Sequence, residues 1–222
     1  MLARTRTLVE ARGGRPSEVG VWGQPAGFEG TPAAVHHAAM RNRGAGFDAL
    51  ADDLDASVAE LIATVGQDPA WWERGRPGRW TVGQHAAHVG ITLGRTADDF
   101  EGAERALRAG TLATVPAKRA LLHRLFLALV AGRGYMPRGL KTADWAVSRG
   151  QPERRATLDV LRQGAERHHA LGRRLDAGEL DRLWIVNPFM ARWHYRLPEM
   201  VRLHAVHVRH HAKQIAEIVA GA

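Results

Sequence analysis

From Phe47 onward, apolar residues recur at steps of three and four positions, with acidic residues mostly between them. This spacing puts the apolar side chains on one face and predicts an amphipathic helix that ends near Gly66. A loop containing several glycines and prolines follows. Thr81 then offers a side-chain oxygen as the N-cap of a second helix, which spans about residues 82–109.

A third helix is predicted after a short connection. Pro116 suits its first turn, and the glycines from Gly132 onward end it. Its expected apolar face comprises Ala120, Leu121, Leu122, Leu125, Phe126 and Leu129.

Two more helices complete the pattern. Pro152 opens one that ends near Gly178, and a turn around Asn187-Pro188 precedes the last, which spans about residues 198–219. No segment shows the clear period-two alternation of a half-buried strand. The sequence therefore predicts an all-α protein built as a bundle of four long helices.

Residues 1–44 differ from the rest of the chain. Glycine and proline occur there at a density that disfavours the interior of a helix or strand, and hydrophobic periodicity is weak. We expect a loose or disordered extension, with room for a short helix over residues 32–41, followed by the bundle domain at 45–222. A protein that begins at Met40 is the alternative.

The amino-acid composition excludes several kinds of functional site. The chain contains no cysteine, so thiol nucleophiles, disulfides and thiolate-bound metals are excluded. No run approaches the roughly 18 to 20 apolar residues that span a bilayer, and the N-terminus lacks the apolar core of a signal peptide. We therefore expect a cytoplasmic protein without a membrane partner. Twelve histidines leave nitrogen as the obvious donor for any metal ion.

A net charge of +8 by itself favours nucleic acid as a partner. The basic residues are almost all arginines, however, and they are scattered through every segment. No basic cluster interleaved with aromatic residues appears, and no nucleic-acid-binding module is evident. Nucleic acid is therefore not expected as a partner.

The last helix carries the strongest candidate chemistry. His207 and His211 are four residues apart, so both imidazoles project from one helical face and suit one metal ion. At about 100° per residue, His204 shares that side of the helix, so periodicity alone does not decide which two residues bind. His85 or His88, on the second helix, would complete a three-histidine site that leaves coordination positions open.

The start of the second helix resembles a known signature. Residues 80–88, WTVGQHAAH, are similar to the tryptophan-serine-x-glycine-x-x-x-x-histidine motif of the DinB/YfiT-like superfamily. In that motif the metal-binding histidine lies eight residues after the tryptophan, which points to His88. Trp80 itself is expected to pack under the second helix. His85 occupies a position that is usually apolar, and it is either an extra ligand or a donor to a ligand.

The last helix resembles the closing signature of the same superfamily, in which two histidines four residues apart precede a glutamine and an aliphatic residue. His207, His211, Gln214 and Ile215 match it. The resemblance implies a four-helix bundle whose metal ligands are His88, His207 and His211.

The resemblance also implies function. Relatives include metal-dependent hydrolases and thiol-dependent transferases, so we expect a zinc- or nickel-dependent enzyme that activates water or a low-molecular-weight thiol for a small-molecule substrate. A homodimer is expected on the same ground. The alternative is a non-catalytic stress-response or binding protein with a structural or vestigial metal site. Asp144 and Trp145 lie in the long connection, and their spacing assigns them no role.

Overall fold

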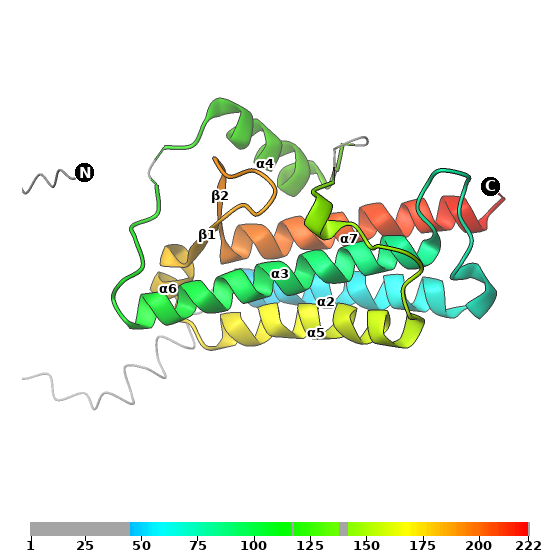
Figure 1. The fold of residues 1–222 in the computed structure, drawn as a ribbon. Coiled ribbons are helices and arrows are strands. Elements are labelled where there is room, and N and C mark those ends of the chain that lie inside the picture. Colours follow the sequence, from blue (N-terminus) through cyan, green and yellow to red (C-terminus); the bar gives the residue numbers. More distant parts are fainter. Residues whose placement is uncertain (1–44, 117, 138–141, 222) are drawn as a thin grey trace, which may run out of the picture.

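The computed structural model describes residues 45–116, 118–137 and 142–221. Four long helices form the bundle in Figure 1: α2 (Ala45–Gly66), α3 (Val82–Arg108), α5 (Arg154–Arg173) and α7 (Leu197–Val219). The predicted four-helix bundle is confirmed. The expected N-terminal extension, residues 1–44, lies outside the described part of the chain and stays a prediction.

Each long helix packs against two others, because α2 contacts α7 and α5 while α3 contacts α5 and α7. Figure 1 shows that α3 and α5 run in one direction and that α2 and α7 run in the other. The chain must therefore return along the bundle between α3 and α5. That long connection carries α4 (Leu121–Arg133) and the short 3-10 helix η2 (Asp144–Ala146) outside the bundle.

Small residues allow the closest approach between helices. A side-chain carbon on Gly164 of α5 would lie 2.6 Å from Cβ of Leu93 on α3, so only glycine fits there. Gly172 likewise leaves space for the ring of Phe47 on α2. Leu61, Leu93, Leu161 and other apolar side chains fill the centre of the bundle without solvent exposure.

The start of α3 is held firmly in place. Thr81 and Gln84 form a reciprocal capping box, as the predicted N-cap required. Gln84 also donates from Nε2 to the carbonyl of Gly150, at 3.1 Å, and Trp72 donates from Nε1 to the carbonyl of Pro152, at 2.7 Å. The first turns of α3 are thus tied to the segment that leads into α5.

Helix α4 departs from the prediction in two respects. It begins at Leu121, because Arg119 is held by two hydrogen bonds to Glu199 of α7 and Ala120 is extended, with ψ of 146°. The predicted apolar face is also wrong: most of its leucines point to solvent. The helix instead turns His123 inward, where its ring stacks on Trp193 at 4.9 Å.

The segment before α7 also differs from the prediction. Helix α5 ends at Arg173, and Gly178 lies within a separate helix, α6 (Ala177–Arg182), which has its own capping box. Two three-residue strands, β1 (Trp184–Val186) and β2 (His194–Arg196), then form an antiparallel hairpin. The predicted turn at Asn187 connects them, but strands this short produce no alternation that a sequence pattern can reveal.

A second short 3-10 helix, η1 (Pro69–Trp71), precedes α3. None of the helices described combines the length and the apolar character needed to cross a bilayer.

Candidate metal centre

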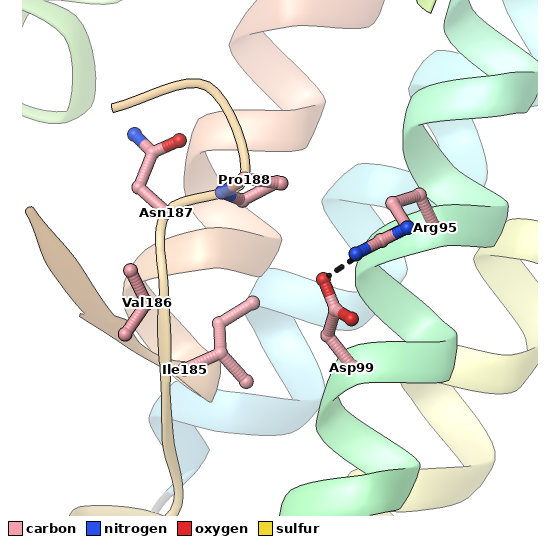
Figure 2. A pocket seen from close by; sticks show the side chains of 6 residues that line it. All are labelled: Arg95, Asp99, Ile185, Val186, Asn187 and Pro188. Atoms are coloured by element: carbon pink, nitrogen blue, oxygen red, sulfur yellow. Dashed lines mark hydrogen bonds and ion pairs between the residues drawn. The ribbon is translucent and has the colours of Figure 1, made fainter. Parts of the chain in front are cut away.

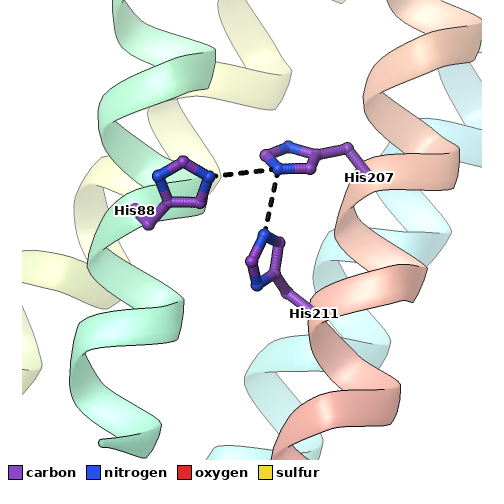
Figure 3. A group of neighbouring side chains, drawn as sticks. All are labelled: His88, His207 and His211. Atoms are coloured by element: carbon purple, nitrogen blue, oxygen red, sulfur yellow. Dashed lines mark hydrogen bonds between the residues drawn. The ribbon is translucent and has the colours of Figure 1, made fainter. Parts of the chain in front are cut away.

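Three histidines meet between α3 and α7. His88 extends from α3, while His207 and His211 extend from α7, and their rings point toward one another in Figure 3. Nε2 of His207 lies 3.2 Å from Nε2 of His88 and 3.0 Å from Nε2 of His211. The structure therefore brings together the three residues that the sequence signatures select. Their role as ligands stays a prediction.

The three candidate ligand atoms lie within 4.8 Å of one another, and two of their separations can be compared with those around one divalent ion. Ligand nitrogens bound at about 2.0 to 2.1 Å are roughly 3.3 Å apart in a tetrahedron and roughly 2.9 Å apart along an octahedral edge. The observed separations of 3.0 and 3.2 Å fall between these values. This geometry suits zinc and nickel equally, so it does not choose between them.

The proton on His88 is positioned by the backbone. Nδ1 of His88 lies 2.8 Å from the carbonyl oxygen of Ala146 in η2. A carbonyl only accepts hydrogen bonds, so Nδ1 carries the proton and Nε2 of the neutral ring keeps a lone pair. A backbone carbonyl behind a ligand histidine is a common means of fixing its tautomer and orientation. His88 thus presents an acceptor nitrogen to the other two rings.

His85 lies behind His211. Their Nδ1 atoms are 2.9 Å apart, and both side chains are buried. If Nε2 of His211 offers its lone pair to an ion, Nδ1 of His211 carries the proton and donates it to His85. His85 is therefore placed to orient His211 through a hydrogen bond, and its ring lies outside the group of three converging ligand atoms.

Burial keeps these imidazoles neutral. It is the largest cause of the lowered pKa of His88, although the hydrogen bond to Ala146 raises that pKa in part. The pKa values of His207 and His211 are well below the ordinary value, first because of burial and then because neighbouring histidines repel a second positive charge. Neutral imidazole is the form that binds metal ions, so the cluster is ready for ligation at neutral pH.

His204 is not part of this cluster. Its Nε2 lies 2.7 Å from Oγ1 of Thr96 on α3, and its ring centre is 5.1 Å from that of His168 on α5. Helical periodicity leaves His204 and His207 on one side of α7, and in the structure it is His207 that faces His88. His204 belongs to a buried polar contact of the core one turn away.

Trp80 has a larger role than the predicted packing beneath α3. Its indole is half-buried, and its centre lies 4.9 Å from the ring of His88 and 5.3 Å from that of His85. It also stacks at 20° to the ring of His211, with the centres 6.2 Å apart. The signature tryptophan therefore forms an apolar wall of the histidine cluster.

Some parts of the site could not be read from residue types. The carbonyl of Ala146 carries no sequence signal, yet it orients His88. Trp145, next to it, packs against Phe189 of the hairpin turn with ring centres 4.8 Å apart. The long connection thus reaches the cluster through its backbone and the hairpin through its side chains.

Comparisons with known proteins bear on the fold. No family model matches the sequence, and no curated protein matches it. Among solved structures, YfiT from Bacillus subtilis matches with a TM-score of 0.50 and 20% sequence identity, over 78% of this chain and 85% of YfiT. The chain has the fold of YfiT. That protein is described as a probable metal-dependent hydrolase with an unusual four-helix bundle topology. The resemblance seen in the two signatures is thereby confirmed at the level of the fold.

Proposed function

We propose that this protein is a metal-dependent enzyme in which His88, His207 and His211 hold one divalent ion. The observation that carries the proposal is the meeting of three Nε2 atoms from two helices, with the proton of His88 held on the opposite nitrogen by Ala146. Among the described residues, the candidate metal-binding group that includes His88 consists of these three histidines and contains no carboxylate. Three protein ligands are typical of catalytic ions, whereas structural zinc sites usually have four.

The reaction class that fits best is hydrolysis of a small-molecule substrate, in line with the description of YfiT. When bound, a zinc or nickel ion supplies Lewis acidity, which polarises a substrate and lowers the pKa of water or of a low-molecular-weight thiol. His88 is held in the ligand tautomer, His85 would accept a hydrogen bond from Nδ1 of a metal-bound His211, and Trp80 excludes water from one side. Transfer to a thiol remains the second reaction class, and its thiol must come from outside a chain without cysteine.

The competing proposal is a non-catalytic protein with a closed metal site. It is tested by replacing the metal with Co²⁺, whose visible spectrum reports coordination number, and by adding azide. An open site binds azide, so its spectrum should change as azide is added until the site is saturated. A spectrum that does not change on addition of azide and that indicates four protein ligands would overturn the enzyme proposal. His207 is the least buried of the three histidines, which favours the open site.

We also propose that the homodimer expected from the resemblance forms through α4. Leu121, Leu122 and Leu125 lie on one side of this helix and are 69%, 66% and 57% exposed. Monomeric proteins rarely expose large apolar side chains in such a group. Sedimentation of the wild type at micromolar concentration should give a dimer, and L122E/L125E should give a monomer. A monomeric wild type, or a variant that stays dimeric, would contradict this interface.

A further inference from the structure

A pocket lies between α3 and the end of β1, about two helical turns from the candidate metal centre. Its volume is about 370 Å³, within the range of roughly 300 to 1,000 Å³ typical of small-molecule sites. Figure 2 shows two charged side chains of α3, Arg95 and Asp99, facing the strand and its turn across this space. The opposite wall consists of Ile185, Val186, Asn187 and Pro188.

We propose that this pocket binds an amino acid through its free α-ammonium and α-carboxylate groups. Arg95 takes the carboxylate, Asp99 takes the ammonium group, and the apolar wall of β1 contacts the remainder. The site would hold one end of the substrate of the metal centre, so its role in the reaction rests on the proposed function. Binding itself depends only on the pocket.

Arg95 has donor capacity that the protein does not use. Within the described residues, its guanidinium contacts Asp99 through Nε alone, at 3.2 Å, and its Cζ lies 5.9 Å from the ring centre of Trp145. Arginines that join helices elsewhere in this protein differ. Arg119 and Arg167 bind carboxylates through terminal nitrogens at 2.6 to 2.9 Å. The terminal nitrogens of Arg95 are therefore left in the geometry that grips a carboxylate in a bidentate manner.

Asp99 complements this arginine. One of its carboxylate oxygens, Oδ2, receives the Nε hydrogen bond, and the side chain keeps 28% exposure toward the pocket. An anion alone would approach Arg95 against the charge of Asp99, and a cation alone would approach Asp99 against the charge of Arg95. A ligand that carries both charges on neighbouring atoms satisfies both residues, which is the reason for choosing a zwitterion.

Asn187 does not compete for that role. Its Nδ2 donates to the hydroxyl of Tyr195 at 3.3 Å, and its Oδ1 accepts from the backbone N–H groups of Phe189 and Met190. The amide therefore shapes the turn. Polar recognition in the pocket is left to Arg95 and Asp99, with buried Ile185 and the half-exposed Val186 as apolar contacts.

The pocket is linked to the metal centre by shared elements. Arg95 follows His88 by seven residues on α3, so both lie on one stripe of the helix, about 10 Å apart along its axis. Trp145 lies over Arg95, and the next residue, Ala146, holds His88 through its carbonyl. The substrate class that spans this distance is an amino acid whose side chain carries the reacting bond toward the ion.

The proposal is tested with three probes of one shape: L-phenylalanine, 3-phenylpropionate, which lacks the ammonium group, and 2-phenylethylamine, which lacks the carboxylate. Calorimetric titrations use wild type, R95Q, D99N and the matched control R105Q, an exposed arginine further along α3. We expect L-phenylalanine to bind wild type and R105Q at least about tenfold more tightly than the other two probes, and each pocket variant to lose about tenfold or more.

Metal content is measured in the same samples, with and without chelator. Equal binding of all three probes, no binding of L-phenylalanine, or an equal loss in R105Q would overturn the pocket assignment, whatever the metal content. A wild type that holds no metal but still discriminates the probes would leave the amino-acid pocket standing and would count against the metal-dependent enzyme instead.

Discussion

His168 makes the fold sensitive to acid in a way that can be calculated. It is fully buried on α5, and its Nδ1 donates to the carbonyl of Gly164 at 2.7 Å. Its Nε2 faces Oγ1 of Thr96 at 3.2 Å, and the charge of Glu101 favours a second proton less than burial opposes it. Burial is the main cause that lowers the pKa of His168 to about 4, from 6.5 in an exposed histidine.

The sign of the effect follows from proton binding. Above pH 6.5 the ring is neutral in both states, so this group adds no pH dependence. Below that value the unfolded chain binds a proton that the native protein does not bind, so native stability falls as the pH falls. At about 1.36 kcal/mol per pH unit, the loss reaches about 2 kcal/mol at pH 5 and levels off near pH 4.

The assay compares urea unfolding of wild type and H168Q at pH 7.5 and pH 5.0, both with chelator so that metal release does not contribute. The variant should be less stable at pH 7.5 because the buried contact is disturbed. Its decrease in unfolding free energy between the two pH values should be smaller than that of wild type by about 2 kcal/mol. The other buried histidines contribute alike to both proteins, except His204, whose pKa is lowered in part by the charge of His168. Equal pH dependence of the two proteins would show that burial of His168 does not make the fold sensitive to acid.

Three further predictions test the site and the packing. His85→Ala removes the hydrogen-bond acceptor behind a ligand and should weaken metal affinity about ten- to a hundredfold in competition with a chromophoric chelator; unchanged affinity would contradict that role. Gly172→Ala pushes a methyl group into Phe47 and should destabilise by about 1 to 3 kcal/mol, whereas Gly94→Ala meets open space and should stabilise by roughly 0.5 to 1 kcal/mol in denaturant unfolding. A chain that starts at Met40 should melt within about 3 °C of the full chain, and a larger drop would disprove a loose extension.

The long helices could be predicted because each buries a continuous apolar face against two neighbours. Helix α4 was also predicted, but its buried face was not, since leucines occur on the side that faces solvent. Its orientation depends on His123, which stacks on Trp193 of a hairpin that is itself too short to predict. A local pattern predicts an amphipathic helix, but it does not reveal which partner the helix meets.

In the candidate site, too, some features could be predicted from the sequence and others could not. Helical angles place His204 and His207 on one side of α7, and only the neighbouring α3 separates them, because Thr96 contacts His204 and His88 faces His207. The family signatures select His207, and in the structure His207 meets His88. The carbonyl of Ala146 had no equivalent signal, because every residue has one and only the fold decides what it faces.

The most direct test of the account is the metal stoichiometry of single alanine variants, measured by elemental analysis on protein purified without a histidine tag. The variants cover all six histidines of the two helices: His85, His88, His204, His207, His210 and His211. The account predicts about one divalent ion per wild-type chain, its loss from the variants at His88, His207 and His211, and its retention at His204 and His210. If His207→Ala kept the ion while His204→Ala lost it, the proposed centre would be wrong.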